Sequence, residues 1–473
     1  MKELEKLLDR IVQRININLR ELDYDVSPFI KGLVPLNQMV KFYAFYGITP
    51  NQTLNFQFRH SSLAGSYFLG KCRITNSILY KSDIRGDELK HRGDVFHYQK
   101  FEIPITRNEG IDIEDSFLIK TLVHNYSHDP ETLEKFFIKD TISTHYGNIH
   151  GSPSDGCYLG PFATVDLTTM RDCVIGAFSY VQAGEIGHLN IGPGTVWVRS
   201  PGEFNFLYRY PRNKLNHYIN FLEGRRPQGF ITNFVEDRKS DFQRVFEVIN
   251  IEPSIPVPVN ASLDRYAVIK PKTRIEENVL VAQRAYLQNA WIGEGANAQE
   301  NCYIINSRLE GYNVTAHGAK IIEADLGKNI FVGFNSFLQG RPNSRLTIGE
   351  ESIIMPHTIV DIKEPLTIPP GHLVWGLITN PKELETNSMS LKDLSKINNG
   401  LIKGNMSFEG NGAGFVSAFR DRIHHILEAN GAFFDGNKNR GHAQKNQNIS
   451  FNTIQPYPDG KLQGLYPTIM IQP

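Results

Sequence analysis

The residues best placed for chemistry are three histidines in one stretch of the chain, His124, His145 and His150. His145 and His150 have four residues between them, and His124 lies 21 positions before His145. In a chain that coils through short strands, His145 and His150 would project from one coil and His124 from the coil below. Three imidazoles with an open fourth position suit a catalytic zinc ion, whose bound water has a pKa of about 7. The same spacing is compatible with three ordinary histidines among the 15 of the chain, and His128 is an alternative to His124.

The coil itself is predicted by a repeat of about six residues. From Tyr266 onward the chain can be cut into blocks such as VIKPKT, RIEENV, LVAQRA and YLQNAW, and the same texture recurs between Leu159 and Val198. Hexapeptide repeats indicate a parallel β-helix, in which about three blocks close one triangular coil and a residue roughly 18 positions on lies one layer above. One coil cannot bury its own interior, so the coils must stack. We therefore predict a mainly β protein, a left-handed parallel β-helix with N-terminal, inserted and C-terminal helical additions.

Changes in this pattern predict five parts of the chain. They are an N-terminal helical region 1–64, a first β-helix segment 65–200, a helical insertion 201–258, a second β-helix segment 259–381 and a helical and irregular tail 382–473. In the first part an apolar stripe at helical spacing predicts a helix that packs on the β-helix or on another subunit. The stripe consists of Leu4, Leu8, Ile11, Ile15 and Leu19.

The composition excludes some classes of function. The chain has 50 Lys and Arg against 50 Asp and Glu, so its formal net charge is zero, which argues against a protein that coats nucleic acid or a membrane surface. No apolar run approaches the roughly 20 residues that span a bilayer, and the N-terminus lacks the apolar region of a signal peptide. Four cysteines lie far apart, as expected for buried thiols in a reducing compartment. We expect a cytoplasmic protein.

The motifs around the histidines resemble those of gamma-class carbonic anhydrase. IRGDELKHRGD comes first, IDIED leads toward the first histidine, and the histidines follow as H-x20-H-x4-H-G. That family is a trimeric left-handed β-helix whose metal lies between subunits. The resemblance implies that Arg85 and Asp87 hold adjacent subunits together and that the three histidines bind the metal. Glu114 and Asp115 stand where the family usually has Gln and Asp beside the metal-bound water.

The second repeat tract is similar to the same family but lacks most of its ligands. In RAYLQNAWIGEGANAQENCYII, Arg284 matches the family's Arg, and Gln299 and Glu300 match its Gln-Asp pair. Ile305 stands at the position of the first histidine ligand, whereas His317 keeps the second. One imidazole cannot hold zinc. The resemblance therefore implies tandem copies, the second with an eroded metal site.

These observations favour a metal-dependent lyase that hydrates CO2 or a similar small electrophile with a metal-bound hydroxide. The expected cofactor is a divalent metal, zinc or otherwise iron or cobalt, in a homotrimer with its site at the subunit interface, and Glu114 would accept a proton. Two other classes remain open. One is a CoA-dependent hexapeptide-repeat acyltransferase, with His317 as the first choice for its base and His145 as the second. The other is a non-catalytic trimeric scaffold that binds a protein partner through its helical parts.

Overall fold

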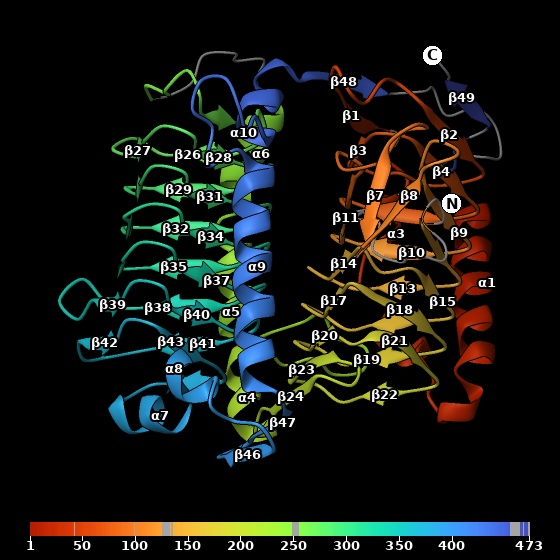
Figure 1. The fold of residues 1–473 in the computed structure, drawn as a ribbon. Helices are drawn as coiled ribbons and strands as arrows, with labels where there is room; N and C mark the ends of the chain where they lie inside the picture. Colours follow the sequence, from red (N-terminus) through yellow and green to blue (C-terminus); the bar gives the residue numbers. More distant parts are fainter. Residues whose placement is uncertain are drawn as a thin grey trace. The chain divides into compact units, whose positions relative to one another are not determined.

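The computed structural model describes residues 1–41, 43–98, 100–124, 133, 136–247, 255–454, 464–466 and 468–471. The chain forms two compact units (Figure 1), each made of discontinuous ranges that divide the chain differently from the five predicted parts. Unit 1 contains 1–195, 219–228 and 449–473, and unit 2 contains 196–218 and 229–448. Each unit is a stack of coils made of short parallel strands. The predicted left-handed parallel β-helix with helical additions is confirmed.

Unit 1 has three sheets, one for each side of its coils. Sheet 1A contains β1 (Ala44–Ile48), β3 (Ser66–Leu69), β6 (Asp83–Arg85), β11 (Leu122–His124), β14 (Asn148–His150), β17 (Thr164–Asp166) and β20 (Tyr180–Gln182). Sheet 1B contains β2 (Phe56–Arg59), β4 (Cys72–Thr75), β9 (Ile111–Glu114), β12 (Phe136–Lys139), β15 (Ser154–Asp155), β18 (Thr168–Arg171) and β21 (Gly184–Gly187). Sheet 1C contains β5 (Ile78–Tyr80), β10 (Phe117–Ile119), β13 (Ile142–Ser143), β16 (Tyr158–Leu159), β19 (Val174–Ile175) and β22 (Asn190–Ile191).

Unit 2 repeats this plan. Sheet 2A contains β25 (Ser262–Leu263), β28 (Leu280–Val281), β31 (Asn297–Ala298), β34 (Val314–Thr315), β37 (Phe331–Val332), β40 (Ile353–Ile354), β43 (His372–Val374) and the antiparallel β45 (Ser388–Ser390). Sheet 2B contains β26 (Val268–Ile269), β29 (Tyr286–Gln288), β32 (Tyr303–Ile305), β35 (Lys320–Ile322), β38 (Phe337–Gln339), β41 (Ile359–Asp361) and β44 (Leu377–Ile378). Sheet 2C contains β27 (Arg274–Ile275), β30 (Trp291–Ile292), β33 (Arg308–Leu309), β36 (Ala324–Leu326), β39 (Leu346–Ile348) and β42 (Leu366–Ile368).

The coils are shorter in unit 1 than the sequence predicts. Asn148 pairs with Thr164, 16 positions on, whereas Leu280 of unit 2 pairs with Asn297, 17 positions on. Single residues with positive φ, such as Asp140 at 43° and Asp172 at 49°, turn some corners of unit 1. Aspartate tolerates this left-handed conformation better than most residues. Such tight corners shorten the coil below the expected 18 residues.

Helix α1 (Lys2–Asn18) packs on sheet 1C of its own unit through most of the predicted apolar stripe, but Leu7 is buried where Leu8 was predicted and Leu19 follows the end of the helix. Two ion pairs join its polar edge to the corner aspartates: Arg10 lies 3.0 Å from Asp115, and Arg14 lies 3.5 Å from Asp140. Two turns, α2 (Ser27–Ile30) and α3 (Leu36–Met39), and the 3-10 helix Arg20–Leu22 follow it. The apolar contacts of α1 involve its own Leu4, Leu7, Ile11 and Ile15 and, on the sheet, Ile78, Tyr80, Phe117, Ile119, Ile142, Tyr158 and Val174.

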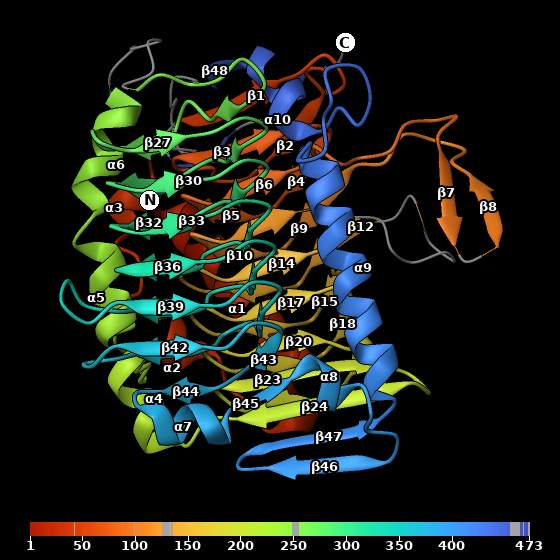
Figure 2. The same cartoon turned by 60° about the vertical axis from the view of Figure 1, so that its left-hand side comes forward.

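Two additions to the β-helix of unit 1 come from unexpected parts of the chain. A hairpin of β7 (Val95–Tyr98) and β8 (Phe101–Pro104) stands out from the coils between β6 and β9 (Figure 2). Two strands of the predicted irregular tail, β48 (Ser450–Ile454) and β49 (Ile469–Ile471), pair antiparallel with β1 and β2. The end of the described chain therefore completes two sheets of unit 1.

The predicted helical insertion contains a strand as well as helices. Strands β23 (Thr195–Ser200) and β24 (Phe204–Arg209) come first, and β24 pairs with β47 (Met406–Gly410), which pairs with β46 (Gly400–Lys403). Helices α4 (Arg212–Tyr218), α5 (Phe230–Glu236) and α6 (Lys239–Glu247) follow. In the tail, α9 (Gly412–Asn430) runs along the stacked strands of unit 2 (Figure 1). Two short helices precede it in the sequence, α7 (Pro381–Thr386) and α8 (Leu391–Leu394), and α10 (His442–Lys445) and the 3-10 helix Asn446–Asn448 follow it. Among the described residues, no helix is long and apolar enough to cross a membrane.

The side chain of Lys320 is buried in unit 2, on the face of sheet 2B that helix α5 covers. Lys320 pairs in register with Tyr303 and Phe337 of sheet 2B, and the ring of Phe234 from α5 packs on both aromatic residues. The Lys320 ammonium donates a hydrogen bond to the carbonyl oxygen of Gly318. Burial lowers the pKa of Lys320 from 10.5 to about 7. The lysine therefore disfavours the folded state, because folding removes a charged group from water.

Replacing Lys320 by methionine should stabilise the protein at neutral pH. The unfolded lysine holds its proton up to about pH 10.5, and the folded one only up to about pH 7, so wild-type stability rises with pH between these values. The variant Lys320→Met loses this dependence, and its free energy of unfolding at pH 7 should be larger by roughly 2–5 kcal/mol. Denaturant unfolding at pH 7 and pH 9 measures both effects. An equally large gain for Lys392→Met, at an exposed position, would contradict this explanation.

Candidate active site

Three of the residues singled out in the sequence meet a fourth polar residue, Asp166, on sheet 1A. Arg85 pairs in register with His124, His124 with His150, and His150 with Asp166, on the neighbouring strands β6, β11, β14 and β17. The residue before each of them points into the core and is fully buried. Since side chains alternate along a strand, the four polar residues share the outer face of the sheet. They form a ladder, which we call the sheet 1A ladder.

At the lower end of the ladder, Asp87 joins Arg85 to His124. One carboxylate oxygen of Asp87 accepts a hydrogen bond of 2.7 Å from Nη2 of Arg85, and the other lies 3.2 Å from Nε2 of His124. The Arg85 side chain is 4% exposed, so its charge requires the nearby carboxylate. Asp87 therefore balances a buried guanidinium and lies against one edge of an imidazole.

At the upper end, Asp166 holds His150. Nδ1 of His150 lies 2.8 Å from Oδ1 of Asp166 in a hydrogen bond, and the hydroxyl of Tyr180 donates to the other oxygen of the same carboxylate. The side-chain amide oxygen of Gln182 lies 2.9 Å from the Tyr180 hydroxyl oxygen. Asp166 is fully buried, and the His150 side chain is 14% exposed. A carboxylate on Nδ1 sets the tautomer of a neutral imidazole, with its proton on Nδ1 and the lone pair on Nε2.

The third predicted metal ligand lies away from the ladder. His145 is in the turn between β13 and β14, with its ring centroid 6.2 Å from that of Tyr146. The register therefore pairs His124 with His150 and not with His145, as the spacing had suggested. Within unit 1, the described residues do not bring ligand atoms of all three histidines within 4.8 Å of one another. The expected divalent metal stays a prediction, and His128 falls outside the described residues.

The predicted carboxylate pair lies on another side of the coil. Glu114 ends β9 of sheet 1B and is exposed. Asp115 turns the next corner with a φ of 45° and pairs with Arg10 of α1. Burial raises the pKa of the Asp115 carboxyl, and the Arg10 charge opposes this rise. Neither residue joins the sheet 1A ladder, so Asp115 has a structural role at the α1 contact.

Unit 2 contains a different histidine and carboxylate. Gly318 N donates to the carbonyl oxygen of Glu300, so that the turns carrying Glu300 and His317 lie in successive coils. Nδ1 of His317 lies 2.8 Å from Oε2 of Glu300, and the ring of Phe334 lies 5.2 Å from the imidazole on its other side. Glu300, matched to the family's Asp by the resemblance, is thus the neighbour of the predicted transferase base. Ile305 lies on β32, and Arg284 turns a corner with a φ of 56°.

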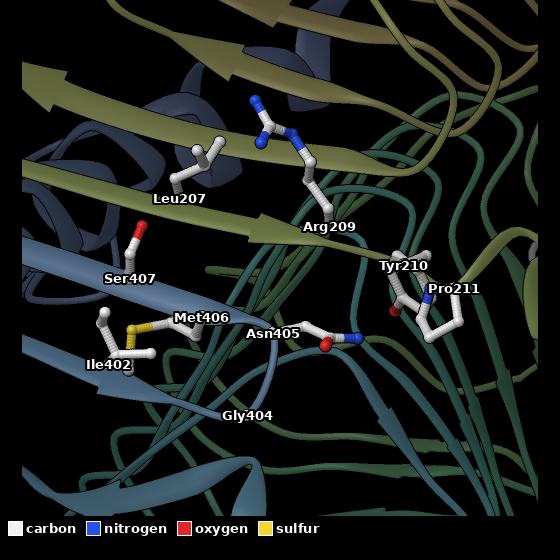
Figure 3. A pocket seen from close by; sticks show the side chains of 9 residues that line it. All are labelled: Leu207, Arg209, Tyr210, Pro211, Ile402, Gly404, Asn405, Met406 and Ser407. Carbon is white, nitrogen blue, oxygen red and sulfur yellow. The ribbon is translucent and has the colours of Figure 1, made fainter.

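A groove of about 460 Å³ lies on β24, β46 and β47 of unit 2 (Figure 3). Its lining includes Leu207, Arg209, Ile402 and Ser407, and the side chain of Ile402 is 81% exposed. None of the predicted site residues lines this groove. It therefore gives no support to the predicted sites.

Sequence reasoning missed Asp166 and Tyr180. Asp166 follows His150 by 16 positions, which is one coil of unit 1, and Tyr180 belongs to the next strand of the ladder. A count by 16 instead of 18 would have placed Asp166 beside His150, whereas Tyr180 pairs with Thr164 and reaches Asp166 from the next strand through its hydroxyl. The sequence contains this spacing, but its meaning becomes clear only when the number of residues in one coil is known.

Comparisons with known proteins change the expected function. Residues 101–223 match a family model described as hexapeptide repeat including loop. The crystal structure of a protein described as a putative acetyltransferase from Desulfovibrio desulfuricans G20 is 51% identical, with a TM-score of 0.94, over 100% of this chain and 99% of that one. A UDP-N-acetylglucosamine acyltransferase from Campylobacter jejuni is 10% identical over 70% of this chain and 80% of that one, and its TM-score of 0.14 carries no weight. A search of curated proteins gives no significant match.

The prediction of carbonic anhydrase activity is therefore wrong. The chain matches, over its whole length, a protein described as a putative acetyltransferase, which agrees with the alternative of an acyltransferase. The hexapeptide-repeat fold is confirmed, whereas zinc and a trimer stay predictions.

Removing the Tyr180 hydroxyl should destabilise unit 1. In Tyr180→Phe, the buried Asp166 carboxylate loses a hydrogen-bond donor, which costs about 1–3 kcal/mol. Chemical denaturation followed by circular dichroism measures the change. Tyr46→Phe is the matched control, because the Tyr46 ring packs edge-on against Phe56 and should keep that contact. Equal stability of the Tyr180→Phe variant and wild type would show that the hydroxyl does not support the carboxylate.

Proposed function

The chain belongs to the hexapeptide-repeat family of the Desulfovibrio desulfuricans protein, and we propose that it is an acyltransferase. It would move an acyl group, acetyl in the simplest case, from a CoA thioester to a hydroxyl or amine of a small-molecule acceptor. The likeness extends over both chains in full. The proposal therefore concerns the whole chain and not one repeat tract.

The observation that carries the proposal is the hydrogen bond of 2.8 Å between His150 and Asp166. Acyl transfer to a hydroxyl needs a base that removes its proton as the oxygen attacks. A carboxylate on Nδ1 leaves Nε2 to accept that proton, and it stabilises the imidazolium that forms. Asp166 is itself held by Tyr180. The ring of His150 is thus fixed in orientation before substrate binds, which is an advantage in a catalytic base.

The reaction follows from this assignment. Nε2 of His150 takes the proton of the acceptor, and the acceptor oxygen or nitrogen forms a bond to the thioester carbonyl carbon. The carbon–sulfur bond then breaks, and the thiolate leaves and gains a proton. The products are the acylated acceptor and free CoA. In this role His150 is the catalytic residue, and Asp166 and Tyr180 are positioning residues.

The sequence favoured other histidines as the transferase base. His317 lies 2.8 Å from Glu300 in unit 2. His145 lies beside Tyr146 in a turn. His317 stays a prediction that the same assay tests. The expected homotrimer also stays a prediction, which light scattering of the purified protein would test.

Replacing His150 should abolish most of the transferase activity. Acetyl-CoA is incubated with a panel of hydroxyl and amine acceptors, and the released thiol is measured with a chromogenic thiol reagent. His150→Ala should lower the rate by roughly 10²- to 10⁴-fold, the usual contribution of a general base. Asp166→Asn should lower it less, because the imidazole remains in place.

Two further variants complete this test. His217→Ala, an exposed histidine of α4, is the matched control and should keep the wild-type rate. His317→Ala measures the alternative base. Thiol release by wild type no faster than in buffer, with every acceptor, would contradict the proposed function. A full rate for His150→Ala with loss in His317→Ala would move the base to His317.

A further inference from the structure

A column of hydrogen-bonding side chains follows one corner of unit 1, directly before the strands of sheet 1C. Each of them donates a hydrogen bond to the carbonyl oxygen two residues earlier in the chain. In the earlier coils these side chains are hydroxyls, and in two later, successive coils they are thiols. The column consists of Ser77, Ser116, Thr141, Cys157 and Cys173.

The two thiols of this column are direct neighbours between coils. Tyr158 and Val174, the residues that follow them, pair in register on sheet 1C, and the amide of Tyr158 donates to the carbonyl oxygen of Cys173 at 2.9 Å. Equivalent residues of successive coils are about 4.8 Å apart. This spacing lies within the range of about 4.4–6.8 Å that Cα atoms have in disulfides. The thiol of Cys157 also lies within hydrogen-bonding reach of the Cys173 sulfur.

The surroundings of the two sulfurs make Cys173 the thiol that ionises more easily. A hydrogen bond from the Cys157 thiol lowers the pKa of Cys173, and the backbone amide of Leu189 acts in the same direction. Burial raises the pKa of the Cys157 thiol well above its usual range. The thiolate is the form of cysteine that reacts with an oxidant, and a second thiol beside it converts the first product into a disulfide. The pair supplies both parts.

Cys173 is buried, but it lies only one coil from the end of sheet 1C. The last strand of this sheet is β22, and the turn before it, residues 187–189, is exposed. Leu189 occupies the column position after Cys173, because its carbonyl oxygen accepts a hydrogen bond from the amide of Val174. A terminal coil with exposed residues opens more readily than a coil inside the stack. A small oxidant therefore reaches Cys173 when a single coil opens locally.

We propose that Cys157 and Cys173 form a dithiol site that a peroxide oxidises to an intramolecular disulfide. The Cys173 thiolate attacks one oxygen of hydrogen peroxide, the oxygen–oxygen bond breaks, and hydroxide leaves with the electron pair. The Cys157 thiol then attacks the sulfur of the resulting sulfenic acid, a sulfur–sulfur bond forms, and the hydroxyl leaves with the thiol proton as water. The peroxide gains the two electrons that the two cysteines lose. This inference concerns unit 1 alone and does not depend on the proposed acyl transfer.

Peptide mapping of the oxidised, folded protein tests the site. The full chain is treated with hydrogen peroxide, its remaining thiols are alkylated in denaturant, and a tryptic digest is analysed without reduction. Trypsin cuts after Arg171, between the two cysteines, so the disulfide should appear as a linked pair of peptides. Cys72 and Cys302 should be recovered alkylated. Both are buried, and neither has a cysteine at the equivalent position of a neighbouring coil.

Serine variants are the matched controls, because serine already occupies this column in two earlier coils. Cys173→Ser should abolish the link, and Cys302→Ser should leave it unchanged; circular dichroism shows whether each variant is folded. Oxidised wild type should unfold about 5 °C above the reduced protein, because the link restricts the unfolded chain, and dithiothreitol should remove this shift. A folded protein that yields no linked pair, or that links Cys72 or Cys302 equally well, would overturn the proposal.

Discussion

The site depends on the in-register pairing of parallel strands in successive coils. Hydrogen bonds between neighbouring coils hold equivalent residues about 4.8 Å apart, so a side chain has its nearest neighbour one coil away and not next in sequence. His124, His150 and Asp166 are 26 and 16 positions apart, and yet they are direct neighbours on sheet 1A. A polar residue in one coil consequently needs a polar partner in the next. This constraint explains why the ladder is continuous.

Buried charge is handled differently in the two units. In unit 1, Asp87 compensates Arg85, and Tyr180 and His150 donate to Asp166. In unit 2, Lys320 lies under aromatic rings and bonds to a backbone carbonyl, and burial lowers its pKa to about 7 at a cost to the stability of the folded state. A compensated ladder can keep charges at a fixed place, and proton transfer needs this. Lys320, whose pKa lies near neutral pH and which has no carboxylate named beside it, does not hold a charge in the same way.

The sequence predicts the architecture well because a six-residue period is a property of many residues at once. It also names Arg85, Asp87, His124 and His150 before the structure brings them together. The sequence-based prediction fails where extra residues interrupt the regular spacing of the repeat. Arg85 and His124 are 39 positions apart because the hairpin of β7 and β8 is inserted between their strands. The next coil is also long, since His150 follows His124 by 26 positions, so the spacing of His124 and His145 suggested a contact that the register does not make.

The same reasoning explains why the function was misjudged while its residues were largely found. A histidine held by a carboxylate serves equally well as a metal ligand and as a general base, since both roles require a fixed tautomer. Motifs that contain this pair therefore do not distinguish a metal centre from an acyl-transfer site. The distinction depends on what lies beside the pair. The register of unit 1 places Asp166 next to His150, where the hydroxyl of Tyr180 donates to its carboxylate, and leaves His145 in a turn. A carboxylate held by a tyrosine hydroxyl fixes the orientation of the neighbouring imidazole, which is what the proposed general base requires.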